Sequence, residues 1–224
     1  MTSELIRWRG VGRCFAWCVL LLAVAGGSAV AQPESLTFGV MAGPVLSDQS
    51  YTFVDPTLEF DPRSSVGISL GMFADWRRSR FVSARLEMLY IRKGSEVKVR
   101  NYGSDFTPGE NTDTLQLNDN IDYLSVAPGL KVHWPRGDGG PYALVAGRLD
   151  IKLGGDSELN AVTTEELEPV VWGATLGAGY DLPIGDSRLL SFETTFHLDF
   201  TDAYDLPRAK VRNRAFVFLL GMTI

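Results

Sequence analysis

The fold is decided by the alternation in residues 190–199, LSFETTFHLD. One set of alternate positions is apolar apart from a threonine: Leu190, Phe192, Thr194, Phe196 and Leu198. The other set is polar: Ser191, Glu193, Thr195, His197 and Asp199. Successive side chains of a β-strand point to opposite faces of a sheet. The stretch therefore predicts a strand with one apolar and one polar face.

Seven further segments show the same period of two: residues 36–43, 66–73, 82–90, 123–132, 143–151, 172–181 and 215–224. In each, one set of positions is apolar and often bulky, and the other is rich in small and polar residues. An eight-stranded barrel has an interior barely wide enough for its own side chains, so the bulky set must point outward. The pattern predicts an all-β fold, an eight-stranded antiparallel transmembrane β-barrel. A soluble barrel and a β-sandwich are the weaker alternatives.

The links between these segments alternate in length. Long polar links are expected at 44–63, 94–120, 154–170 and 201–211, and short ones at 75–80, 134–140 and 184–188. Outer-membrane barrels have long external loops and short periplasmic turns, so both ends of the barrel chain should be periplasmic. Pro128 lies within the fourth segment and cannot donate a ladder hydrogen bond, which predicts a bulge or a missing bond there.

Aromatic residues collect near the segment ends, where amphipathic rings favour the two membrane–water boundaries. The expected periplasmic belt is Trp76, Phe81, Trp134, Tyr142 and Tyr180, and the expected outer belt is Tyr90, Tyr123, Trp172 and Phe200.

The N-terminus has the features of a secretory signal. Arg7, Arg9 and Arg13 precede a short apolar stretch, and the Ala29-Val30-Ala31 motif predicts cleavage after residue 31, leaving a barrel domain over 32–224. Cleavage would remove both cysteines and change the net charge from −6 to −8. An acidic chain argues against nucleic acid as a partner, and its mean hydropathy of +0.03 excludes a bundle of membrane helices.

Several short stretches together resemble the PorT-like outer-membrane β-barrel family of Bacteroidota-type bacteria. They are residues 39–43, 86–90, 93–94, 123–128, 177–179 and 220–221, with the strand that carries Glu193. The resemblance covers most of residues 35–224 and implies that Pro128 is a family feature. It implies the fold and the outer membrane more firmly than an activity, although the family's namesake is associated with type IX protein secretion.

Four charged residues fall on the predicted lumen face: Arg85, Glu87, Lys131 and Glu193. Buried charges are costly unless they are paired, so we predict a mixed-sign network across the lumen that fills and rigidifies the barrel. A proton or ion path is the alternative, which the narrow lumen of so small a barrel disfavours.

Catalysis would have to involve His197, which shares its face with Thr195 and Asp199. A relay needs a nucleophile, a base and an orienting acid in mutual reach, and three neighbours along one strand do not provide that geometry. His133 should lie at a strand end. Two histidines and no cysteine after cleavage argue against a zinc site, and no cofactor is expected.

The external links are the remaining candidates for function. Three of them carry candidate residues. The aromatic residues of the first link could form a contact patch or a lid over the barrel mouth: Tyr51, Phe53 and Phe60. The second link holds Tyr102, Phe106 and several acids, and the third is acidic, so these two links could bind divalent cations or be solvated loops: the acids of the third are Glu158, Glu165, Glu166 and Glu168. We expect a non-enzymatic outer-membrane protein, structural or surface-binding through these links. The alternatives are an accessory role in secretion or envelope assembly and a lipid-modifying barrel enzyme. Expected partners are membrane lipids, the barrel-assembly machinery and an unidentified surface or periplasmic protein.

Overall fold

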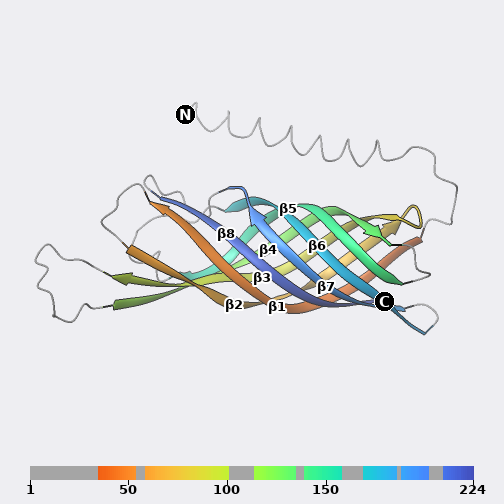
Figure 1. Ribbon diagram of the computed structural model, residues 1–224, viewed down its shortest axis with the longest axis horizontal. Helices are drawn as coiled ribbons and strands as arrows, with labels where there is room; N and C mark the ends of the chain where they lie inside the picture. The colour runs from red at the N-terminus through yellow and green to blue at the C-terminus, as the bar shows by residue number, and fades with distance from the viewer. Residues whose placement is uncertain are drawn as a thin grey trace, which may run out of the picture.

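Eight antiparallel strands form one closed barrel in the computed structural model, in the order β1 to β8 (Figure 1). The strands are β1 Ser35–Phe53, β2 Glu59–Arg77, β3 Val82–Arg100, β4 Thr114–His133, β5 Gly140–Ser157, β6 Val170–Ile184, β7 Arg188–Asp199 and β8 Ala209–Thr223. The structure describes residues 35–53, 59–100, 114–134, 139–157, 169–185, 188–201 and 209–224. The predicted signal at 1–31 lies outside these ranges. The described residues include no helix long and apolar enough to span a membrane.

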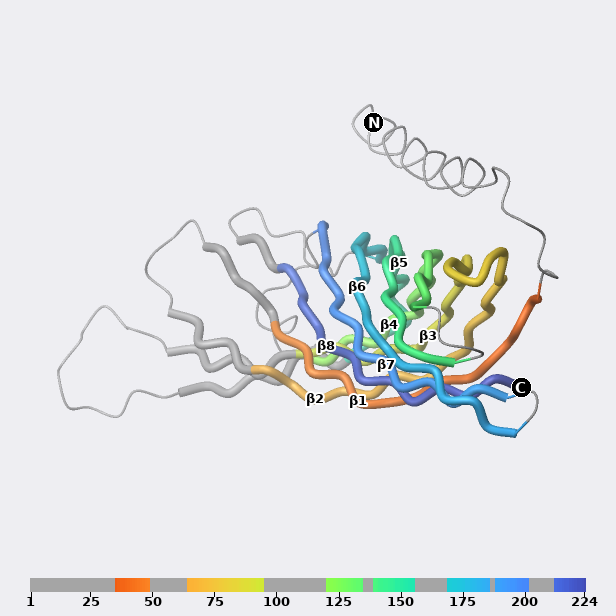
Figure 2. The backbone as a smooth tube through the Cα atoms, turned by 45° about the vertical axis from the view of Figure 1, so that its right-hand side comes forward, coloured from red at the N-terminus to blue at the C-terminus, as the bar shows by residue number. Residues whose placement is uncertain are grey.

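Pairing between the first and last strands closes the barrel. The β1–β8 register runs from Gly39 opposite Thr223 to Phe53 opposite Ala209, and β1 and β8 lie side by side in Figure 1. The start of β1 and the C-terminus lie at the same end, on the right in Figure 2. The ends of β2, β4 and β6 and the starts of β3, β5 and β7 also lie at this end, which we call the short-turn end. We call the opposite end of the barrel the long-link end.

Burial alternates along every strand, with the apolar set outward, as predicted. Leu70 is large and apolar, yet its exposed fraction is 59%. Large apolar side chains on the outer faces of β1 and β8 are exposed as well, among them Phe38 and Leu220. The inward set is buried and mostly small or polar. A sheet with this distribution is stable only if its outer face meets lipid.

The strands extend further than the sequence predicted. The expected first link at 44–63 is mostly strand, because β1 continues to Phe53 and β2 begins at Glu59. The second link likewise shrinks to 101–113. At the other end β2 runs to Arg77, into the expected turn at 75–80. Ladder hydrogen bonds need only backbone groups, so a polar sequence can continue a strand beyond the apolar band.

Pro128 interrupts the ladder without ending the strand. The β4–β5 register passes from Val126 opposite Leu149 to Gly129 opposite Ala146, and Ala127 and Pro128 have no partner between them. On the other side, Pro128 keeps its place opposite Leu86 of β3. A missing bond at this position was the expected consequence of a residue without a backbone N–H.

The aromatic belts need two corrections. Tyr123 and Tyr142 are 1% and 4% exposed and point into the lumen, because both share the parity of their strand's buried set. The outward members are Trp76, Phe81, Tyr90, Trp134, Trp172, Tyr180 and Phe200. Tyr90 donates its hydroxyl to Asp122 Oδ1 at 2.8 Å, and Arg92 Nε donates to the same oxygen at 2.7 Å.

Candidate functional site

Arg85 is the centre of a buried charge cluster near the short-turn end. Its Nε lies 2.8 Å from Glu87 Oε1 and 3.6 Å from Asp75 Oδ1, and its Nη1 lies 3.1 Å from Glu193 Oε2. The guanidinium also lies over the ring of Phe73, with Cζ 4.3 Å from the centroid. One cation from β3 therefore joins acids on β2, β3 and β7 across the lumen.

Lys131 from β4 extends the same cluster toward β6. Its Nζ donates to Asp181 Oδ2 at 2.8 Å and to Asp75 Oδ2 at 3.4 Å. Ser191 donates its hydroxyl to the other oxygen of Asp181 at 2.6 Å. Lys131 Nζ also lies 3.8 Å from the ring centroid of Tyr142, a cation–π contact.

We call this group the lower cluster; its charged members are Asp75, Arg85, Glu87, Lys131, Asp181 and Glu193, with Tyr142 and Ser191 as hydrogen-bond donors. Tyr142 donates its hydroxyl to Glu193 Oε2 at 2.7 Å. Four carboxylates meet two cations, so the cluster is acidic when all its groups are ionised. Tyr142 reaches Glu193 by lying over Gly179, where a Cβ would be 2.4 Å from the phenol oxygen.

A second group, the upper cluster, lies nearer the long-link end and consists of Lys93, Arg148, Asp150, Thr195, His197 and Asp199. Lys93 Nζ lies 2.5 Å from Asp150 Oδ2 and 3.6 Å from Asp199 Oδ1. Arg148 pairs with Asp199 through Nη2, and its Nη1 lies 2.5 Å from His197 Nδ1. The two cations match the two carboxylates in number.

Gly173 makes room for Arg148 in the upper cluster. A Cβ at this position would lie 2.7 Å from Arg148 Nη2 and 2.3 Å from the carbonyl oxygen of Leu198. A side chain there would collide with a fixed backbone atom as well as with the guanidinium. The absence of a side chain on β6 therefore positions a cation of β5 against the acid of β7.

The remaining lumen holds apolar side chains together with buried serine, threonine and asparagine residues. The apolar side chains form one buried group: Met41, Val45, Phe73, Leu89, Ile91, Ile121, Tyr123, Val171, Ala215, Val217 and Leu219. Together with the two charge clusters, these side chains leave little of the described lumen wall exposed to solvent.

The geometry gives His197 a structural environment. Its ring is 2% exposed, with Arg148 on Nδ1 and the Thr195 hydroxyl 3.2 Å from Nε2. Both ring nitrogens are occupied, and Asp199 is bound to Arg148 instead of to the imidazole. A hydrolytic relay needs an exposed nucleophile with its base in reach, which this arrangement does not provide.

Of the four predicted network residues, the structure joins Arg85, Glu87 and Glu193 directly, and Lys131 through Asp75, which contacts both cations. Sequence reasoning missed Asp75, Asp181 and Tyr142. Asp75 had been placed in a turn, and the parity of Asp181 and Tyr142 was a signal that could have found them. The external-link residues Tyr102, Phe106, Glu158, Glu165, Glu166 and Glu168 lie outside the described residues, and the side chains of Tyr51, Phe53 and Phe60 are likewise not described.

A family model described as "outer membrane protein beta-barrel domain" matches residues 30–205. The chain belongs to this family. No curated protein matches it. From the usual topology of outer-membrane barrels, we expect the short-turn end to be the periplasmic end and the long-link end to be the outer end.

Solved structures agree with the fold. OprG from Pseudomonas aeruginosa is 13% identical with a TM-score of 0.53, and the match covers 85% of this chain and 95% of OprG. The outer membrane protease OmpT from Escherichia coli is 7% identical with a TM-score of 0.50, covering 88% and 98%. Neisserial surface protein A is 14% identical with a TM-score of 0.47, covering 85% and 99%. At such identities the similarity to OprG and OmpT concerns the fold alone.

Proposed function

We propose that this protein is a closed, non-enzymatic outer-membrane barrel that binds a surface partner at its outer end. The closed lumen supports the non-enzymatic part of the proposal, because the buried clusters leave no room for a substrate beside His197. Function then has to lie on the outer faces and ends of the barrel.

One observation carries the proposed surface role: three strands continue past the ladders of their neighbours. Residues 59–64 of β2 pair with 95–100 of β3, and residues 96–100 of β3 pair with 114–118 of β4. The β4–β5 register begins only at Asp119, and the β1–β2 register stops at Ser65. Within the described ranges, this three-stranded projection therefore has two unpaired edges. Free strand edges bind extended peptide segments by adding a strand.

The projection can be removed without disturbing the barrel. Glu96 and Asn118 are register partners, so replacing residues 97–117 with an Asn-Gly turn should close a hairpin in the same register. We expect heat-modifiable folding to persist while partner capture from intact envelopes is lost. A matched control replaces residues 159–167 with a Gly-Ser linker of equal length and should keep the partner. Unchanged capture by the 97–117 variant would contradict the surface role.

A second, narrower proposal is that the protein acts as an accessory component of protein secretion, as its resemblance to PorT-like barrels would imply. The stretches at 39–43, 86–90 and 123–128 that resemble PorT-like barrels favour an accessory role in protein secretion as the second candidate. A deletion strain should then retain secreted cargo in the periplasm, and complementation with the intact chain should release it. Normal secretion in the deletion strain would exclude this role and leave the surface role standing.

The proposed partners follow from the position of the barrel in the outer membrane. Outer-membrane lipids contact the apolar outer face, and the barrel-assembly machinery inserts the chain. Crosslinking from the β8 strand during insertion is the measurement that tests the assembly partner.

A further inference from the structure

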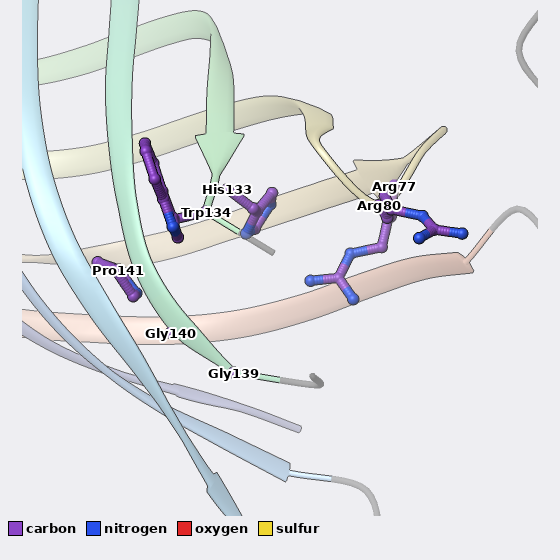
Figure 3. A pocket seen from close by; sticks show the side chains of 7 residues that line it. All are labelled: Arg77, Arg80, His133, Trp134, Gly139, Gly140 and Pro141. Carbon is purple, nitrogen blue, oxygen red and sulfur yellow. The ribbon is translucent and has the colours of Figure 1, made fainter. Parts of the chain in front are cut away.

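A small pocket opens at the periplasmic end of the barrel, outside both charge clusters (Figure 3). It is a shallow depression, and the space of about 240 Å³ around its lining includes open solvent. The end of β2, the β2–β3 turn, the end of β4 and the start of β5 supply its lining: Arg77, Arg80, His133, Trp134, Gly139, Gly140 and Pro141. In Figure 3 the two arginines lie on one side of the pocket and the His133–Trp134 pair on the other. The pocket is small and open to solvent, so it can receive a single chemical group but not a whole small molecule.

The pocket has a surplus of positive charge. Among the residues that the structure describes, neither Arg77 nor Arg80 forms an ion pair, and the only contact recorded for Arg80 is a distant one, 6.0 Å from the Phe81 ring centroid. The nearest carboxylates of the lumen, Asp75 and Asp181, are already bound to Lys131. Two guanidiniums at a pocket with no acid among its described lining residues are a site for an anion.

The walls of the pocket are fixed before any ligand arrives. Ser79 Oγ accepts the backbone N–H groups of Phe81 and Val82 at 3.2 and 3.1 Å, which holds the turn that carries Arg80. The His133 N–H donates to the Phe81 carbonyl at 2.7 Å, and the Trp134 N–H donates to the Pro141 carbonyl at 2.9 Å. These bonds join all three chain segments around the pocket.

Two further details preserve the shape of the site. The His133 ring is held by a 2.8 Å hydrogen bond between Nε2 and the Ser83 hydroxyl. Gly140 has a φ of 136°, a conformation that residues with a side chain rarely adopt, so the wall at β5 requires glycine. A pre-formed wall lowers the entropic cost of binding a small anion.

We propose that this pocket binds the phosphate of an anionic phospholipid from the periplasmic leaflet. The phosphate chemistry follows from the guanidinium fork, which donates two parallel hydrogen bonds to phosphate oxygens. The lipid source follows from position: Trp134, 73% exposed, lines the pocket, and Trp76 and Phe81 are exposed at the same end. Such rings mark the depth of the headgroups. Exposed Val132 precedes the pocket on β4 and offers an apolar surface for an acyl chain.

Native mass spectrometry of the full-length mature protein, incubated with phosphatidylglycerol in detergent, tests this proposal. The Arg77→Gln/Arg80→Gln variant should bind phosphatidylglycerol about tenfold or more weakly, since a hydrogen bond to a charged group contributes about 1.5–3 kcal/mol. Arg188→Gln removes an exposed arginine outside the pocket lining and should bind like the unaltered protein. Urea midpoints of all three proteins should agree, so that a loss of binding is not a loss of folding.

Two results would overturn the proposal. Equal phosphatidylglycerol binding by the double variant and the unaltered protein would show that the pocket is not the site. Inorganic phosphate or glycerol phosphate that binds as tightly as the lipid would assign the pocket to a soluble phosphate instead. Neither result depends on the proposed surface role, which concerns the opposite end of the barrel.

Discussion

Replacing Arg85 with Met should be among the most destabilising single changes in the lumen. The guanidinium is fully buried and lies within 3.6 Å of three carboxylates, Asp75, Glu87 and Glu193. Its removal leaves four acids facing Lys131 as the one remaining cation of the lower cluster. Breaking a buried ion pair by removing one partner costs about 3–5 kcal/mol, because the other charge stays buried and uncompensated.

The size of this effect can be measured by urea unfolding of the refolded barrel in detergent micelles, followed by tryptophan fluorescence. With a slope of about 2 kcal/mol per M, a loss of about 4 kcal/mol lowers the midpoint by about 2 M. Arg188→Met, at an exposed position at the same end of the barrel, is the matched control and should change stability by less than about 0.5 kcal/mol.

A second substitution distinguishes the effect of the lost charge from the effect of the lost packing. Arg85→Met/Glu87→Gln removes the carboxylate closest to the lost guanidinium, while Glu193 keeps the hydroxyl of Tyr142 at 2.7 Å. We expect the double variant to regain about 1–3 kcal/mol relative to Arg85→Met. If the two changes were additive, or if Arg85→Met lost less than about 1 kcal/mol, the lower cluster would not be a coupled electrostatic network.

Other predictions address the lumen wall, the lipid face and the enzyme alternative. Gly179→Ala places a Cβ 2.4 Å from the Tyr142 ring and should cost about 1–3 kcal/mol in the same urea assay, whereas Gly147→Ala, with nothing within 4 Å, should have little effect. Leu70→Arg puts a charge on the exposed lipid face and should lower stability in lipid vesicles by about 2–4 kcal/mol, while Leu70→Phe should be tolerated. His197→Gln should leave the mass profile of lipid A in the expressing cells unchanged. A shifted profile would instead support the alternative that the protein is a lipid-modifying enzyme.

Parity along the strands predicted the fold and the inward direction of Arg85, Glu87, Lys131 and Glu193 before any coordinates. It did not predict their partners. Which residues face one another across a lumen depends on the stagger of the strands, and the hydrophobic pattern of one strand does not encode that stagger. Lys131 thus reaches Asp181, a residue on β6 that lies two strands away.

The errors all concern residues near the ends of the predicted segments. Tyr123 and Tyr142 were assigned to the belts because they lie near segment ends, although their parity placed them inside. Asp75 was assigned to a turn because the apolar alternation weakens after Phe73, while the backbone ladder continues to Arg77. Hydrogen bonding between strands is independent of side-chain polarity, so strand ends are the least predictable part of such a sequence.

The hydrogen bonds that cross the lumen connect strands that are not neighbours. Lys93–Asp150, Lys131–Asp181, Tyr142–Glu193 and Arg148–Asp199 join residues 50 to 57 positions apart. No single hairpin contains such a pair, so each bond forms only after the sheet has curled. Interactions that form after the rate-limiting step slow unfolding without speeding folding. If the sheet curls after the rate-limiting step of folding, we expect the charged lumen to slow the unfolding of an inserted barrel while changing its rate of folding little.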